Sequence, residues 1–140
     1  MIIGAPGYAT TKPESATITV TDVGKTNNTT VNVQFLTVDY VQIRDAHGGK
    51  GDVVTTFNSV PGATKILYAA RYNYSAGYIG DCPDSVTWSS SNITVATIVP
   101  SSGISTTVTS QSVGTAIITI NDTSTGKTNT TTVNVQAWTV

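Results

Sequence analysis

The chain has 140 residues, a length that fits one ordinary domain with or without an appendage. Charged residues make up 11% of it, and its net charge is −1 at pH 7. Thr, Val and Ile together supply 56 residues, whereas Leu occurs twice and Glu once. Because β-branched side chains lose rotamer freedom in helices, this composition excludes an all-helical protein and predicts an all-β fold. No basic run supports nucleic-acid binding, and no apolar run approaches the ~18 residues of a membrane span.

The first predicted element is a β-hairpin that the chain repeats near its end. Residues 24–34 recur as residues 126–136, with ten of eleven positions identical. In both copies apolar side chains alternate with hydroxyl-bearing ones, which is the period of a strand with one apolar face. The apolar face of the first copy comprises Ile18, Val20, Val31, Val33 and Phe35. The second copy places Ile118, Ile120, Val133 and Val135 on the corresponding face.

Several short strands are predicted between the two hairpins, separated by residues typical of turns. They cover residues 38–44, 53–57, 64–74, 85–90, 95–99 and 104–110. Residues 45–52 form a glycine-rich loop, and Gly77, Gly80 and Pro83 mark a second loop. Short strands with regular turn signals predict an antiparallel β-sandwich over residues 35–140, preceded by an N-terminal arm and hairpin over residues 1–34.

Three segments resemble the bacterial Ig-like domains of group 2, over about residues 36–138. They are V-T-W-S-S-S-N at 86–92, V-A-T-I at 95–98 and V-G-T-A-I-I-T-I at 113–120. The resemblance implies an Ig-like sandwich with Trp88 and Val86 in its core, together with the apolar face of the second hairpin. Such domains occur in tandem arrays on bacterial and archaeal cell surfaces, including adhesins and invasins, and on phage head and tail proteins. The family carries no catalytic residues, so the resemblance implies none here. The first hairpin matches only the final strands of such a domain, as if it closed a preceding one.

The sequence holds few residues suited to chemistry. Asp45, His47 and Asp52 are potential metal ligands, but their glycine-rich loop is more typical of a plain polar turn. The carboxylates are scattered, so paired acid–base catalysis has no basis. Cys82 is the single cysteine, which excludes an intrachain disulfide, and its flanking carboxylates Asp81 and Asp84 raise the pKa of a thiol. We therefore expect no enzyme activity, no metal and no cofactor.

Tyrosines provide the candidate binding residues. On the strand at 64–74, alternation places Tyr68, Tyr72 and Tyr74 on one face, and Tyr78 follows in the next loop. An exposed strip of this kind would suit sugar stacking or a protein contact, with Tyr72, Tyr74 and Tyr78 as the binding residues. The alternative is that Tyr68 and Tyr72 fill the core while the others cover it. Six N-x-Ser/Thr sequons indicate either glycosylation or the Asn and Thr that hairpin turns favour.

These features predict a non-catalytic structural or surface-display protein. The first hairpin cannot bury its apolar face alone, so it must pack on the second domain or on a neighbouring subunit, of which we expect the neighbour. The expected partners of the protein are copies of the chain or other structural proteins of an assembly and, in addition, surface glycans. The N-terminus lacks a secretory signal and begins with Met inside a repeat, which favours a short reading frame that is not exported. The main expectation is a phage virion component, in head decoration or on the tail surface. The alternative is a module of a cell-surface adhesin, array or extracellular filament.

Overall fold

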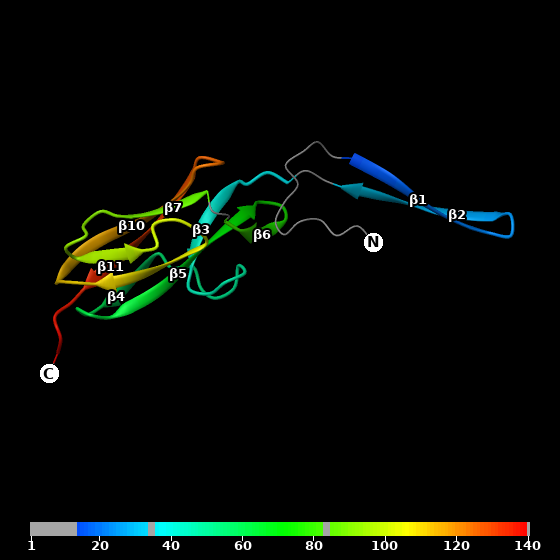
Figure 1. The fold of residues 1–140 in the computed structure, drawn as a ribbon. Helices are drawn as coiled ribbons and strands as arrows, with labels where there is room; N and C mark the ends of the chain where they lie inside the picture. The colour runs from blue at the N-terminus through cyan, green and yellow to red at the C-terminus, as the bar shows by residue number, and fades with distance from the viewer. Residues whose placement is uncertain (1–13, 34–35, 83–84, 140) are drawn as a thin grey trace. The chain divides into compact units, whose positions relative to one another are not determined.

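The computed structural model describes residues 14–33, 36–82 and 85–139 (Figure 1). The chain divides into two compact units, residues 1–37 and 38–140, with a boundary three residues after the expected one. All regular elements of the described residues are strands, which agrees with the β-branched composition. Among these residues no helix is long and apolar enough to cross a membrane.

The smaller unit contains one antiparallel hairpin, formed by β1 (Glu14–Asp22) and β2 (Lys25–Val33). Its two turn residues, Val23 and Gly24, both have positive φ, at 41° and 71°. Two-residue turns with positive φ at both positions match the right-handed twist of the paired strands, and glycine adopts this conformation without strain. Phe35, expected on the apolar face of this hairpin, lies outside the described residues.

The first sheet of the larger unit has four strands in the order β4-β11-β10-β7. Their bounds are Thr56–Ser59 for β4, Val86–Ser90 for β7, Gly114–Asp122 for β10 and Lys127–Val135 for β11. β10 pairs antiparallel with both β7 and β11, whereas β4 lies parallel to β11 at the sheet edge. The sheet is therefore antiparallel except at this edge, where a crossover connection rather than a hairpin delivers β4.

The second sheet follows the order β3-β5-β9-β8, with β6 also paired to β5. Its strands are β3 Tyr40–Arg44, β5 Thr64–Asn73, β6 Gly77–Asp81, β8 Ala96–Val99 and β9 Ser105–Ser110. The expectation that the segment around Gly77 and Gly80 is a loop is wrong, because this segment forms β6. Its two glycines mask the strand pattern, since glycine is depleted in strands generally.

The core of the larger unit lies between these two sheets. All six side chains expected there are buried, with Trp88 3% exposed and Val86 fully covered. The others are Ile118, Ile120, Val133 and Val135. The opposite sheet contributes Val41, Ile43, Leu67 and Val108 to the same cluster. Alternation along each strand thus places one apolar row in the core and one hydroxyl-rich row outside.

Candidate assembly surface and its counterpart in the sandwich

The two duplicated hairpins fold with the same strand register. In the first, Ala16 faces Val31 and Asp22 faces Lys25, and in the second Ala116 faces Val133 and Asp122 faces Lys127. The turn of the second hairpin is two residues longer. Each side chain of β1–β2 therefore has an equivalent in β10–β11, so β10–β11 shows which contacts such a hairpin makes when it is covered.

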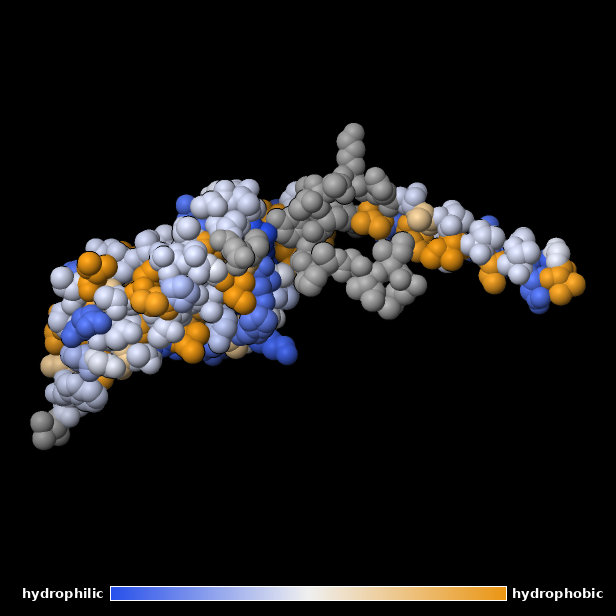
Figure 2. Space-filling view, viewed as in Figure 1, coloured by the Kyte–Doolittle hydropathy of each residue, from blue (hydrophilic) through white to orange (hydrophobic). Residues whose placement is uncertain are grey.

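The apolar face of β1–β2 is exposed, whereas its equivalent is buried. Ile18 is 45% exposed, Val20 66% and Val33 40%, and Val31 is half-buried. Figure 2 shows apolar side chains along the surface of this hairpin. The equivalent residues Ile118, Ile120, Val133 and Val135 are between 0% and 3% exposed. We call this uncovered face of β1–β2, including Asp22 and Asn27, the arm face.

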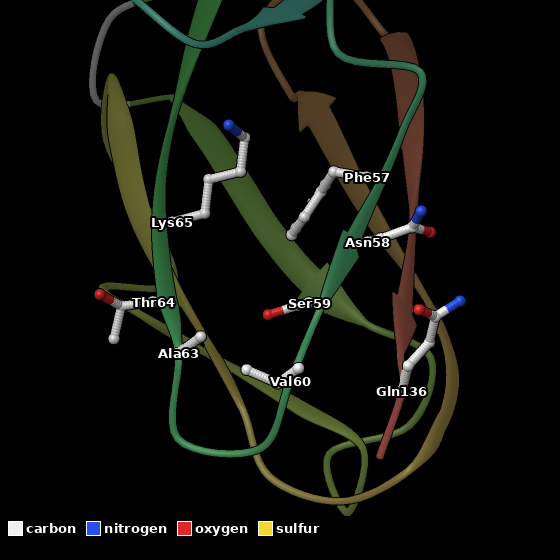
Figure 3. A pocket seen from close by; sticks show the side chains of 8 residues that line it. All are labelled: Phe57, Asn58, Ser59, Val60, Ala63, Thr64, Lys65 and Gln136. Carbon is white, nitrogen blue, oxygen red and sulfur yellow. The ribbon is translucent and has the colours of Figure 1, made fainter. Parts of the chain in front are cut away.

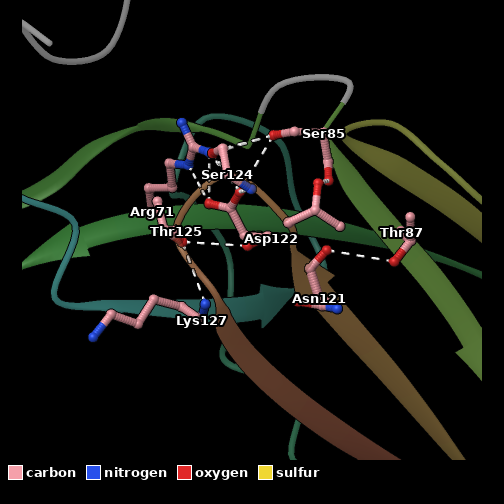
Figure 4. Close-up of polar contacts among 9 residues, drawn as sticks. Arg71, Ser85, Thr87, Asn121, Asp122, Ser124, Thr125 and Lys127 are labelled. Atoms are coloured by element: carbon pink, nitrogen blue, oxygen red, sulfur yellow. Dashed lines mark hydrogen bonds and ion pairs between the residues drawn. The ribbon is translucent and has the colours of Figure 1, made fainter.

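β10–β11 also carries a buried ion pair to the opposite sheet (Figure 4). Arg71 on β5 donates from Nε to Asp122 Oδ2 and from Nη2 to Oδ1, both at 2.6 Å. Both residues are buried, and the Ser124 hydroxyl donates to Oδ1 at 2.8 Å. Burial raises the pKa of Asp122, but the hydrogen bonds from Arg71 and Ser124 and the charge of Arg71 outweigh it, so the pKa lies below its usual value.

A second polar contact joins the same two sheets. The Asn129 amide on β11 donates from Nδ2 to the Val41 carbonyl of β3 at 3.0 Å. In β1–β2 the equivalent of Asp122 is Asp22 and that of Asn129 is Asn27, and both are exposed. A hollow of about 180 Å³ on the hairpin is lined by Ile18, Val20, Asn27, Asn28 and Thr29.

The expected tyrosine strip is wrong for Tyr72. Tyr72 is only 5% exposed, because the Tyr40 ring stacks on it at 5.1 Å and the Arg44 guanidinium lies 5.2 Å from its ring centroid. Burial is also the main cause that raises the pKa of Tyr72. Tyr74 is 80% exposed and lies 5.3 Å from the Tyr40 ring. An accessible aromatic surface therefore consists of Tyr74 with Tyr40 rather than of a continuous strip along β5.

Tyr78 is partly exposed and packs under the glycine-rich loop. A Cβ on Gly49 would collide with its ring, so this loop position requires glycine. The Tyr78 hydroxyl donates to Asp81 Oδ1 at 3.0 Å. Burial and, next, this hydrogen bond raise the pKa of Tyr78 to about 12. Tyr78 is therefore held against the glycine-rich loop and Asp81 rather than free to rotate toward a ligand.

The residues considered as metal ligands do not converge. His47 Nε2 lies 2.8 Å from Asp81 Oδ2, while the Asp45 carboxylate accepts a hydrogen bond from the Asp52 backbone N–H at 2.7 Å. No group of three His, Cys, Asp or Glu side chains among the described residues is placed to hold a metal ion. These contacts fix the shape of the loop at 45–52.

Cys82 is fully buried beside the ion pair. Burial, followed by the charge of Asp122, raises the pKa of its thiol to about 12. From the sequence we expect the flanking carboxylates to raise this pKa. Asp81 does raise it, but by less than burial does, and Asp84 lies outside the described residues. A protonated, buried thiol is a poor nucleophile and a poor metal ligand.

A hollow of about 480 Å³ on the sandwich lies between β4 and β5 (Figure 3). Lys65 carries the only charge among the residues that line this hollow. Its Nζ lies 5.6 Å from the Phe57 ring centroid, so this charge already has an aromatic contact. The other lining residues are Asn58, Ser59, Val60, Ala63, Thr64 and Gln136. These side chains form no cluster of titratable groups suited to catalysis.

Sequence reasoning missed the polar residues that matter most at the sheet interface. Arg71 shares the face of Leu67 and Ala69 in the predicted alternation, which already places its guanidinium toward the core. A buried arginine requires a carboxylate partner, and the only Asp that recurs in both hairpins occupies positions 22 and 122. This recurrence is the signal that points to Asp122.

Comparisons with known proteins show the fold. No family model matches the chain, and no curated protein matches its sequence. The S-layer protein SbsC matches at a TM-score of 0.56 and 20% identity over 91% of this chain and 17% of that one. A structure of SbsC domains 4 and 5 matches at 0.52 and 19% over 88% of this chain and 58% of that one. The chain thus spans 17% and 58% of these two SbsC structures. The expected all-β, Ig-like sandwich is confirmed.

Proposed function

We propose that this chain is a non-catalytic structural module of a cell-surface assembly built from Ig-like modules, and that its arm face joins it to an adjoining module. The observation that carries this proposal is that β1–β2 exposes the surface that β10–β11 buries. Burying one Val or Ile side chain contributes about 1.5–3 kcal/mol, and a lone two-stranded hairpin is at best marginally stable. Covering the arm face is therefore strongly favoured.

The comparisons favour the cell surface over the virion as the location. The matched SbsC structures are of a surface-layer protein and comprise several consecutive domains. The match to SbsC covers 91% of this chain, whereas residues 38–140 make up less than three-quarters of it, so the similarity extends into the smaller unit. Nothing in the comparisons supports the phage virion reading. We propose other Ig-like modules of the assembly, including those in copies of this chain, as partners, and group 2 of the bacterial Ig-like domains as the family.

Binding to isolated cell envelopes tests the joining role. The purified full chain should bind envelope sheets from the source cells, while a chain lacking residues 1–37 stays folded but does not bind. Val20→Asp should weaken binding roughly tenfold or more, because a carboxylate on the arm face must be desolvated. Thr19→Asp, on the opposite face of the same strand, is the matched control and should bind normally.

Two results would contradict this proposal. One is equal envelope binding by the full chain and by residues 38–140. The other is that antibodies against residues 38–140 label purified virions and leave the surface of intact cells unlabelled.

Tyr74 supports a second, auxiliary proposal, contact with surface glycans. Its exposed ring, beside Tyr40, provides the flat face on which a sugar ring packs. Tyr74→Ala should weaken binding on a glycan array while changing the free energy of unfolding by less than about 0.5 kcal/mol. Ile66→Ala, a change at an exposed residue of β5, serves as the control. If array binding is unchanged in Tyr74→Ala, the aromatic surface has no part in glycan recognition.

A further inference from the structure

We propose that the arm face is covered by an Ig-like sheet that lacks its own closing hairpin and presents an arginine, at the position of Arg71, to Asp22. This inference rests on the proposed joining role and specifies the chemistry of the partner. It follows from the duplication, because β10–β11 has the same register as β1–β2 and displays the contacts that these strand positions make when they are covered.

The apolar part of the arm face calls for a partner shaped like the β3–β5 sheet. Ile18, Val20, Val31 and Val33 correspond to Ile118, Ile120, Val133 and Val135. In the sandwich these side chains pack against Val41, Ile43 and Leu67, among others. Because the alternation and the register agree, a sheet of the same kind fits the arm face without a change of register.

Asp22 determines the charge of the partner. In the covered hairpin its equivalent Asp122 is buried and held by two hydrogen bonds from Arg71. A partner sheet that covers the arm face covers Asp22 as well, and an ionised carboxylate is buried only when it is paired. Lys127, the equivalent of the neighbouring Lys25, is exposed in the covered hairpin and leaves this role to Arg71, so we expect the partner to carry an arginine that reaches Asp22. Asn27 adds a second requirement, a backbone carbonyl like that of Val41, which accepts from Asn129.

Two other occupants satisfy these requirements less well. An intact second copy has an arginine at position 71, but its own β10–β11 already occupies that sheet, so insertion of an arm would only expose another hairpin. Two arm faces packed on one another bury apolar surface, but the described residues of the arm include no arginine for Asp22. A separate module with an unclosed sheet satisfies all three requirements.

An extended chain tests this inference. Residues 1–13 are replaced by a copy of residues 38–113, which are the larger unit without its closing hairpin. The copy is followed directly by residues 14–140 of the protein. Glu14→Gly is included because Gly114, at the equivalent position, leaves no room for a Cβ beside Val95. If the arm closes this sheet, the extended chain shows two cooperative unfolding transitions, and the β1–β2 amides become protected from hydrogen exchange. Ile18→Asp should abolish only the transition of the added module.

A double-mutant cycle tests the arginine. Asp22→Ala, or Arg71→Ala in the added segment, should lower the melting temperature of the added module by about 10 °C or more. The two changes together should lower it by clearly less than the sum of the separate shifts. Thr19→Ala, on the other face of β1, should leave it unchanged.

Each remaining outcome overturns a stated part of the inference. If the two shifts in melting temperature are additive, or if Asp22→Ala causes no shift, the arginine pair is ruled out. The closed module and the joining role are then retained. An unfolded added segment with unprotected β1–β2 amides rules out this kind of partner sheet. Dimers with protected arms and an unfolded added segment show that a second arm is the occupant. Loss of envelope binding on removal of residues 1–37 is measured separately, so the proposed function can survive any of these results.

Discussion

Replacing Trp88 by alanine is expected to destabilise the larger unit by about 3–5 kcal/mol, as large-to-small changes in a core do. The indole is 3% exposed between the sheets, and its Nε1–H donates to the Gly103 carbonyl at 2.9 Å. The alanine variant leaves a cavity and also an unpaired carbonyl, which by itself is worth about 1–3 kcal/mol when buried. The β7 backbone pairing to β10 remains, so the variant retains the fold at reduced stability.

Urea unfolding followed by circular dichroism measures this loss. Circular dichroism is preferred because the second tryptophan, Trp138, is exposed and dominates the fluorescence once Trp88 is absent. Thr87→Ala, an exposed neighbour on the same strand, is the control and should change the free energy of unfolding by less than about 0.5 kcal/mol. A loss below about 1 kcal/mol for Trp88→Ala would mean that the indole does not fill the core.

The strand pairs of the two hairpins are visible in the sequence, because apolar and polar side chains alternate along most of each strand. Such strands permit only one face toward a core, and a slip of one residue would expose the whole row. The apolar side chains of β10 and β11 could therefore be placed correctly from residue type alone. The same argument makes the arm face a predictable surface, since its residues repeat those of the buried face.

The sequence is less informative where strands are short or where polar residues enter the core. β6 escapes detection because two of its five residues are glycines, which carry no alternation signal. For Tyr72 the sequence leaves both an exposed strip and a core position open, because alternation gives the side of the sheet but not what covers it. Here Tyr40 and Arg44, the two end residues of β3, lie alongside β5 because β3 pairs with it, and they cover the Tyr72 ring.

The Arg71–Asp122 pair illustrates the remaining gap between sequence and structure. The partners lie 51 residues apart and join opposite sheets, so no local pattern links them. Only the prediction that Arg71 shares a face with Leu67, combined with the recurrence of Asp at 22 and 122, brings them together. This ion pair is also the feature of the core with the strongest expected dependence on pH.

Removing either partner of this pair is expected to destabilise the larger unit by about 3–5 kcal/mol at pH 7, because the remaining charge is buried without compensation. Arg71→Leu leaves the Asp122 carboxylate without its two guanidinium hydrogen bonds, and Asp122→Leu leaves the guanidinium unpaired. The double variant Arg71→Leu with Asp122→Leu should be more stable than either single variant, since no buried charge remains. Thermal unfolding at pH 7 measures all three against the wild type.

The pH dependence separates this ion pair from a simple packing effect. The folded-state pKa of Asp122 lies below its unfolded value, so its stabilisation is present above about pH 4 and is lost as the pH falls through the folded pKa. In Arg71→Leu the hydrogen bonds and charge of Arg71 are gone, and only the hydrogen bonds of Ser124 and Thr125 still oppose the effect of burial on the Asp122 pKa. We expect burial to prevail and to raise this pKa, so that the Asp122 contribution changes sign and this variant regains stability on acidification. The other carboxylates titrate equally in both chains, so the difference between their pH profiles isolates Asp122. If wild type and Arg71→Leu differ by the same free energy at pH 3 and pH 7, then Arg71 stabilises the sandwich by packing rather than by pairing with Asp122.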